Sequence, residues 1–246
     1  MKLTFLGTNG WYDTETGNTV SCLLESAQYN IVFDAGNGLH RLDKYIKNEK
    51  QIYIFISHFH LDHIIGLHLL AKFNFKSIKL FGQKGTIKYL NSIIKQPFTK
   101  SFDDLTYKVA INEMKQGEHK IPFPVTSKEL FHSSPSFGYR LELDGKVISY
   151  CTDTGECKNL LSLAKSSDVL ITECSYRYKA ESLEWPHLDP ETAAYIAKEV
   201  EAKRLFLTHF DPTHYSSLEE RGEAEKSARK IFKNTIVAKD LMQFEI

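Results

Sequence analysis

The stretch SHFHLDH at Ser57–His63 decides the fold, because it places four metal-ligand side chains directly after an apolar strand. The preceding residues, QIYIF, have the apolar and β-branched character of a buried strand. Crowded imidazoles would repel one another on protonation unless a cation bound them. Imidazole and carboxylate are natural ligands of divalent first-row metals, so the segment predicts a metal site rather than a polar loop. Its ligand side chains are His58, His60, Asp62 and His63.

The spacing within this segment predicts two metals rather than one. His58 and His60 alternate as residues of an extended chain do, so their side chains can point the same way. Asp62 and His63 follow the turn and can face a second metal beside the first.

Four further residues repeat one pattern, in which a ligand-type side chain ends an apolar strand. The strands read NIVFD, VTSKELFH, KVISYCTD and RLFLTH. Any one of these residues could be a turn residue or a hydrogen-bonded histidine. Together they indicate one site, because sites in α/β proteins form where strands end. The residues are Asp34, His132, Asp153 and His209.

The chain has no low-complexity tract, internal repeat or proline- and glycine-rich linker, which predicts a single domain over residues 1–246. Strands dominate the first third, and strands and helices alternate after residue 150. Residues 101–130 are interpreted as two or three antiparallel strands. This order favours two mixed sheets face to face with helices outside. Helices are expected at residues 39–47, 64–73, 84–95, 156–165, 190–201 and 217–232.

Composition narrows the class of protein. The 246 residues include 31 basic and 31 acidic side chains, a net charge of zero, and 42% are hydrophobic. This is typical of a soluble globular protein and argues against a chain that coats nucleic acid non-specifically. The four cysteines form no CxxC pair, so we expect free, mostly buried thiols and a reducing, cytoplasmic location. We expect neither a secretory signal nor a membrane span.

The motifs resemble those of the metallo-β-lactamase superfamily. HFHLDH matches its HxHxDH signature, and the four strand-ending residues match its other motifs in order. The chain looks most similar to the ribonuclease Z-like branch, through FLGTNG, FDAGNG, HSSPSFGYRLE, TDTG, ITEC and LTHF. HLDPETAA, which begins at His187, is similar to an additional histidine motif of that branch.

The resemblance implies an α/β (α+β) protein with a four-layer αββα sandwich and a dinuclear site at one edge, between the sheets. It implies the following roles: His58, His60 and His132 hold one metal, Asp62, His63 and His209 hold the other, Asp153 bridges them, and Asp34 orients a ligand from behind.

Hydrolysis is the chemistry that such a site supports. Two divalent ions about 3.5–4 Å apart lower the pKa of a bridging water, and the resulting hydroxide attacks an electrophile. The resemblance also implies that His187 does not bind metal and acts as a general acid toward the leaving group. Together with Asp62 at the reacting metal, it is an expected catalytic residue. Nitrogen and oxygen ligands without thiolate favour zinc, with manganese or iron as alternatives.

The expected substrate is a small, cyclic or short nucleotide phosphodiester. The segment between His132 and Asp153 has room for one hairpin, whereas ribonuclease Z carries a long tRNA-binding arm there. Net charge zero points the same way. We therefore expect a small phosphodiester substrate, no stable nucleic-acid partner and no membrane partner, with a homodimer left open.

Three alternatives remain open at this point. The protein could be a ribonuclease Z-type tRNA 3′ endonuclease, or a hydrolase of carboxylic esters, thioesters or lactams that uses the same two metals. It could also be a metal-binding ligand sensor without turnover, although every metal position is filled.

Three aromatic residues lie beside motifs and either line the substrate mouth or pack at its rim: Trp11, Tyr12 and Trp185. Ser134 and Ser136 either contact a phosphate oxygen or cap a turn.

Overall fold

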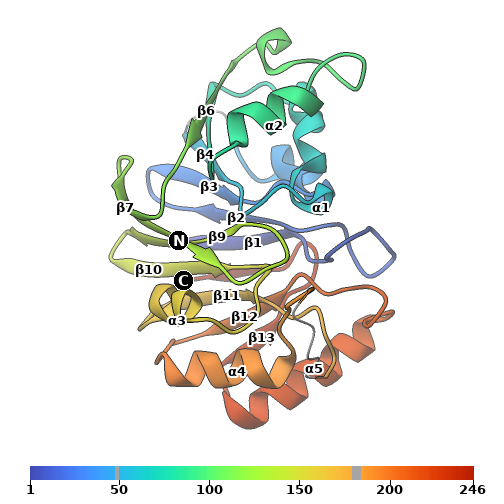
Figure 1. The fold of residues 1–246 in the computed structure, drawn as a ribbon, viewed down its shortest axis with the longest axis vertical. Helices are drawn as coiled ribbons and strands as arrows, with labels where there is room; N and C mark the ends of the chain where they lie inside the picture. The colour runs from blue at the N-terminus through green and yellow to red at the C-terminus, as the bar shows by residue number, and fades with distance from the viewer. Residues whose placement is uncertain (48–49, 179–183) are drawn as a thin grey trace.

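The chain forms two β-sheets that lie face to face, with helices on both outer sides (Figure 1). The structure is a computed structural model that describes residues 1–47, 50–178 and 184–246. Each sheet has seven strands and mixes parallel with antiparallel pairs. The expected αββα sandwich is therefore confirmed.

The first sheet has the strand order β14-β1-β2-β3-β4-β5-β6. Its antiparallel half contains β14, β1, β2 and β3, and its parallel half contains β3 to β6. Its strands are β1 (Lys2–Gly7), β2 (Ser21–Glu25), β3 (Tyr29–Phe33), β4 (Gln51–Phe55), β5 (Ser77–Gly82), β6 (Lys108–Glu113) and β14 (Gln243–Glu245).

The second sheet has the order β13-β12-β11-β10-β9-β8-β7. Here β10 to β13 are parallel, and β7 to β10 are antiparallel. Its strands are β7 (Gly117–Lys120), β8 (Pro124–Leu130), β9 (Ser136–Leu143), β10 (Lys146–Cys151), β11 (Val169–Glu173), β12 (Leu205–Thr208) and β13 (Thr235–Val237).

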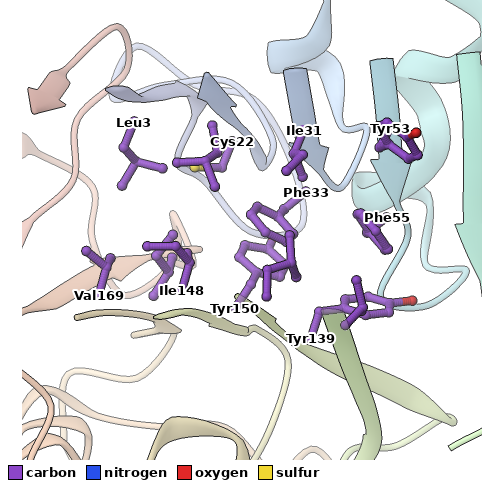
Figure 2. Packing of buried hydrophobic residues seen from close by; sticks show 14 of the residues in the cluster. Leu3, Cys22, Ile31, Phe33, Tyr53, Phe55, Tyr139, Ile148, Tyr150 and Val169 are labelled. Carbon is purple, nitrogen blue, oxygen red and sulfur yellow. The ribbon is translucent and has the colours of Figure 1, made fainter. Parts of the chain in front are cut away.

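The main core lies between the sheets and is rich in aromatic rings (Figure 2). Side chains alternate along β3, so Phe33 points into this core and Val32 points to the helices outside. Phe33 stacks on Tyr150 of the opposite sheet with 4.7 Å between ring centroids. Parallel strands covered on both faces need apolar side chains on both, which explains the nearly continuous apolar sequence of β3 and β4.

Two further cores lie under the helices, one on the outer face of each sheet. The outer layers are visible at the two ends of the long axis (Figure 1). On the first sheet they are η1 (Asn37–Lys44), α1 (Leu61–Ile64), η2 (Ile65–Lys72), α2 (Thr86–Ile93) and η3 (Phe102–Asp104), and on the second α3 (Lys158–Ala164), α4 (Pro190–Glu199) and α5 (Leu218–Ile231).

Two of the expected helices are not regular α-helices. Residues 37–44 form a 3₁₀ helix, and residues 61–72 form one α-helical turn followed by a 3₁₀ helix. The N–H of Gly66 donates to the carbonyl of Ala35 at 2.8 Å, outside the helix, and so interrupts the i→i−4 ladder. A Cβ on Gly66 would lie 2.1 Å from the Gly36 carbonyl oxygen, so only glycine permits this close approach.

The interpretation of residues 101–130 as antiparallel strands is wrong for β6. This strand pairs in parallel with β5 and belongs to the first sheet, whereas β7 and β8 belong to the second. The apolar pattern identified the strands but carried no information on their partners.

In the part of the chain that the structure describes, no helix is long and apolar enough to cross a membrane. All four cysteines are free thiols; Cys22, Cys151 and Cys174 are buried and Cys157 is partly exposed.

The substitution Phe5→Ala tests the core between the sheets. The Phe5 side chain is fully buried, and its ring lies 5.3 Å from that of Phe206 in the other sheet. We expect the free energy of unfolding to fall by about 3–5 kcal/mol, measured by urea denaturation. The substitution leaves a cavity and removes packing contacts with both sheets. Phe98→Ala is the matched control, since Phe98 is 71% exposed, and its change should stay within about 0.5 kcal/mol. Equal effects of the two substitutions would contradict this packing.

Candidate metal centre

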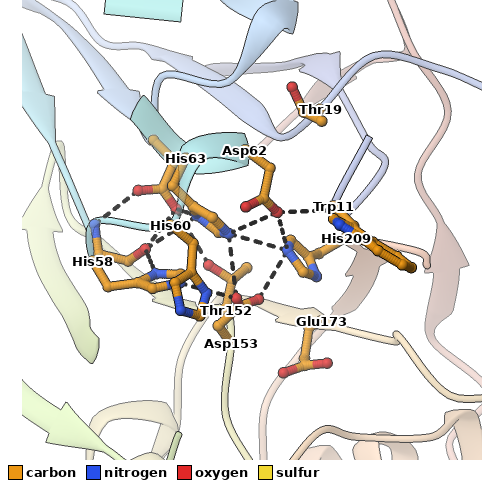
Figure 3. Close-up of polar contacts among 12 residues, drawn as sticks. Trp11, Thr19, His58, His60, Asp62, His63, Thr152, Asp153, Glu173 and His209 are labelled. Carbon is orange, nitrogen blue, oxygen red and sulfur yellow. Dashed lines mark hydrogen bonds and ion pairs between the residues drawn. The ribbon is translucent and has the colours of Figure 1, made fainter. Parts of the chain in front are cut away.

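The carboxyl ends of the parallel strands of both sheets meet at one edge of the sandwich, where the site forms. The residues directly after β3, β4, β10 and β12 all contribute to it. Ligand atoms of one group lie within 4.8 Å of one another, and those of a second group are equally close (Figure 3). The first group is His58, His60, His132 and Asp153, and the second is Asp62, His63 and His209.

Asp153 lies between the two groups. Its Oδ1 is 2.9 Å from Nε2 of His209, and its Oδ2 is 3.2 Å from Nε2 of His58 and 3.3 Å from Nε2 of His63. One carboxylate therefore reaches ligands of both groups, the arrangement that a bridging ligand requires.

The hydrogen bonds behind the imidazoles aim their free nitrogens into the site. Nδ1–H of His63 donates to Asp34 at 2.8 Å. Ser175 Oγ donates to the carbonyl of His209, so its oxygen accepts from Nδ1–H of the same residue at 3.0 Å. Ser57 Oγ donates to Asp34 and accepts from Nδ1–H of His58, also at 3.0 Å. Each contact fixes the tautomer that leaves Nε2 as a lone pair for a metal.

The geometry of the free nitrogens fits divalent cations. Nε2 of His63 and Nε2 of His209 are 3.0 Å apart, although both are acceptors in the tautomers just described. Nε2 of His58 is buried without a hydrogen-bond partner. Buried acceptors that face one another are costly unless a positive charge lies between them. All the converging donors are imidazole nitrogens and carboxylate oxygens, which suit a metal such as zinc, manganese or iron.

The electrostatics divide the site into two halves. Burial, followed by repulsion from His58, lowers the pKa of His60 to about 4, and burial lowers the pKa of His132 to about 4. Burial also acts to lower the pKa of His209, but the Asp153 carboxylate outweighs it and raises the pKa to about 10. The imidazoles of the first group are thus neutral and can bind a cation beside the ionised Asp153, whereas the carboxylates favour the protonated form of the histidines in the second group.

Asp34 is fully buried behind the site rather than in it. Its carboxylate accepts from the backbone N–H of Ser57 at 2.7 Å, the hydroxyl of Tyr150 at 2.7 Å and Nδ1–H of His63 at 2.8 Å. Burial alone would raise the pKa of Asp34, but the charge and hydrogen bond of His63 outweigh it and lower the pKa. The carboxylate is therefore ionised and can hold the His63 ring in place.

Three of the strand-ending residues adopt left-handed backbone conformations. The φ angles of Asp34, Asp153 and His209 are 55°, 55° and 53°. Such angles are uncommon outside glycine and cost about 1 kcal/mol or more each. The left-handed backbone turns each side chain away from its strand and toward the site. The packing of the surrounding strands and cores stabilises this conformation.

His187 lines the cleft above the site and lies outside the two groups just described, but it forms a third set of potential ligand atoms with Asp153 and Glu173, all within 4.8 Å of one another. Its Nδ1–H donates to the Glu173 carboxylate at 2.8 Å, and the N–H of Thr154 donates to the same carboxylate at 2.6 Å. Burial acts to lower the pKa of His187, but the Glu173 carboxylate outweighs it and raises the pKa. The ring is thus oriented and favoured in its protonated form, as a general acid must be.

Sequence reasoning gave no role to several residues that support the site, although Glu173 was part of the ITEC motif. Glu173 ends the apolar strand β11, the same signal that identified the other strand ends. Ser175 and Tyr150 gave no such signal, because each acts through a partner that is remote in the chain. Ser136 is buried and donates to the Thr152 carbonyl, whereas Ser134 Oγ lies 3.4 Å from Nε2 of His60. Of the two serines, Ser134 is the one that reaches the ligands.

The profile of the β-lactamase superfamily domain matches residues 29–210. The chain belongs to the β-lactamase superfamily. Similarity extends beyond the matched residues to complete proteins. The chain is 29% identical to the ribonuclease Z of Prochlorococcus marinus (strain MIT 9301), with all of both chains covered, and 26% identical to that of Methanosarcina acetivorans, of which 98% is covered. The first alignment runs over 315 positions, more than the 246 residues of this chain, so that relative carries residues that this superfamily member lacks.

Solved structures agree with this membership. The crystal structure of the short form of human tRNase Z has a TM-score of 0.77 and 25% identity, and covers 100% of this chain and 99% of its own. A metallo-β-lactamase fold protein of Bacillus subtilis has a TM-score of 0.78 at 22% identity, over 99% of this chain and 98% of its own, and shows the fold alone. The expected superfamily, its ribonuclease Z-like branch and the class of metal-dependent hydrolase are confirmed.

The expectation of a small-molecule substrate without a nucleic-acid partner is wrong. The full-length similarity to proteins named ribonuclease Z and to tRNase Z contradicts it. The argument from net charge failed because that number averages the whole surface. A scissile phosphate interacts with the few atoms around it, and in a two-metal site the bound cations supply the positive charge there.

The substitution Asp34→Asn tests the support behind the metal centre. It keeps the size of the side chain but removes the charge that orients His63. We expect metal affinity to fall by about 10–100-fold, measured by competition with a chromogenic chelator. Asp43→Asn is the matched control, because Asp43 forms an exposed ion pair with Lys72 far from the ligands. Unchanged metal affinity in Asp34→Asn would contradict the role given to Asp34.

Proposed function

We propose that this chain is a metal-dependent phosphodiesterase of the ribonuclease Z type that cleaves RNA, acting as one domain over residues 1–246. The observation that carries the proposal is Asp153 between two ligand groups at the base of an open cleft. Full-length similarity to proteins named ribonuclease Z supports RNA as the substrate class. Zinc is the proposed metal, and the buried free thiols support a cytoplasmic location.

The two groups of converging side chains are the proposed ligands of the two metals. His58, His60 and His132 would hold one ion, Asp62, His63 and His209 the other, and Asp153 both. When bound, two divalent ions supply a nucleophile from water near neutral pH and stabilise negative charge on phosphoryl oxygens. The protein fixes the positions of these charges through the hydrogen bonds behind each imidazole.

Asp62 has a second task besides ligation. Its Oδ2 accepts the backbone N–H of Trp11 at 2.7 Å and lies 3.2 Å from Nε2 of His209. The carboxylate thereby ties the loop before β2 to the reacting half of the site. We therefore place Asp62 among the catalytic residues.

His187 supplies the proton for the leaving oxygen. The Glu173 carboxylate holds Nδ1–H, so Nε2 is the atom that can present a proton to a substrate in the cleft. After cleavage the same carboxylate favours reprotonation of the neutral ring, because it stabilises the imidazolium.

The proposal predicts that metal-loaded protein cleaves a precursor tRNA with a 3′ extension. Elemental analysis should find about two metals per chain, the number that two-metal hydrolysis needs, and a chelator should stop cleavage. Asp62→Ala should reduce cleavage to background with an unchanged circular dichroism spectrum, whereas the exposed Asp43→Ala should cleave normally.

Two results would refute this function. One is a metal content of one ion or none in active protein. The other is efficient hydrolysis of carboxylic esters, thioesters or lactams by protein that leaves both precursor tRNA and linear RNA intact.

The substitution His187→Ala separates proton transfer from metal binding. We expect the turnover number to fall by about 10²–10⁴-fold while the metal content stays the same. Both quantities are measured on the same preparation, by RNA cleavage and by elemental analysis. His68→Ala serves as the control, because His68 is exposed and its ring bonds to the local Ile65 carbonyl. Loss of metal in His187→Ala would show that His187 is a ligand instead.

A further inference from the structure

The cleft above the ligand groups is aromatic at its rim, and histidine is the basic residue type among the described residues that line it. Its volume is about 670 Å³, and its walls include Trp11, Phe59, Tyr176 and Trp185. Among the described residues that line it, none is a lysine or an arginine. Away from the histidines of the metal centre, phosphates beyond the scissile one therefore meet no lysine or arginine among these described residues, and we infer that another kind of contact holds the rest of the substrate.

Trp11 stands beside the second ligand group. Its backbone N–H donates to Asp62 at 2.7 Å, and its φ of 60° is left-handed, a strained conformation for a bulky residue. The loop lies tightly against the site, since a Cβ on Gly10 would be 2.5 Å from the His209 ring. Yet the Trp11 side chain is 66% exposed. The backbone thus holds a large apolar ring at the rim without burying it (Figure 3).

Trp185 stands beside the first ligand group. Its ring centroid is 5.8 Å from that of His60 and 6.4 Å from that of His132, and the side chain is 53% exposed. One tryptophan therefore accompanies each half of the metal centre. A phosphodiester bound across both groups would therefore have a tryptophan near each of its two halves.

We propose that Trp11 and Trp185 stack on the two nucleobases that flank the scissile phosphodiester, so that the site selects unpaired RNA. Stacking of a base on an aromatic side chain contributes about 1–3 kcal/mol and tolerates any base, because every base has a π face. It needs the base to be unstacked and accessible, as it is in single-stranded RNA and not in a duplex. This inference rests on the proposed function and adds the residues that position its substrate.

The chain allows a direct test, because Trp11 and Trp185 are its two tryptophans. Trp11→Phe leaves Trp185 as the fluorescent reporter, and Trp185→Phe leaves Trp11. In a metal-loaded His187→Ala background, which slows cleavage, a short single-stranded RNA should quench each reporter. An RNA with an abasic nucleotide on one side of the cleavage position should fail to quench the tryptophan on that side.

Kinetics on the wild-type background give the second readout. Trp11→Leu and Trp185→Leu should each lower kcat/KM on single-stranded RNA by about 5- to 150-fold, the equivalent of one lost stack. The phenylalanine variants keep a ring and should recover most of this loss. In each leucine variant, an abasic nucleotide on the side of the missing tryptophan should lower kcat/KM little further, because the stacking contact is already lost. Tyr195→Leu, on an exposed tyrosine of α4, is the control and should change nothing.

The outcomes separate this inference from the proposed function. RNA cleavage that changes by less than about twofold in both leucine variants, with neither tryptophan quenched, overturns the stacking site and leaves the function standing. Quenching without cleavage by the wild-type protein refutes the function and leaves the stacking site. Loss of bound metal in a leucine variant would overturn the inference for that residue, because its effect would then be structural.

Discussion

The buried carboxylate of Asp34 is the constraint on which the site depends. It is fully buried and ionised, so the surrounding structure must supply donors or bear the cost of an uncompensated charge. The donors come from Ser57 after β4, from His63 in α1 and from Tyr150 in the opposite sheet. One anion thus joins both sheets and the ligand-bearing turn. Displacing the second sheet would deprive this buried charge of the Tyr150 donor.

The same arrangement explains why strain is tolerated at this edge. Parallel strands from both sheets end here, and the residues that follow them must turn their side chains back toward one point. Asp153 and His209 do so through left-handed backbone angles, and Asp34 does the same behind them. Three apolar cores anchor the strands on either side, so the folded packing can offset a few kcal/mol of local strain. The site is precise because the strands that carry it are rigid.

Much of this could be predicted from the sequence, for identifiable reasons. The segment Ser57–His63 and the residues that end four apolar strands carry both the chemistry and the topology, since strand ends converge. The pairing of β6 with β5 and the interruption at Gly66 could not be predicted, because both depend on partners remote in the chain. Glu173 carried the strand-end signal and was recognised only as part of a motif. Whole-chain charge misled the expectation about nucleic acid because it says nothing about where cations bind.

A chain with no net charge can still act on a polyanion if its positive charge is concentrated where the bond breaks. Two bound cations would place that charge at the scissile phosphate, and the cleft walls add rings rather than lysines. Recognition would then depend on whether the bases next to the scissile bond are unpaired and free to stack, rather than on the length of phosphate backbone that the protein contacts. The segment between His132 and Asp153 is consistent with this division, because the β9–β10 hairpin accounts for most of it. On the proposed function, selectivity for an accessible, unpaired stretch of RNA would follow from the aromatic residues that line the cleft.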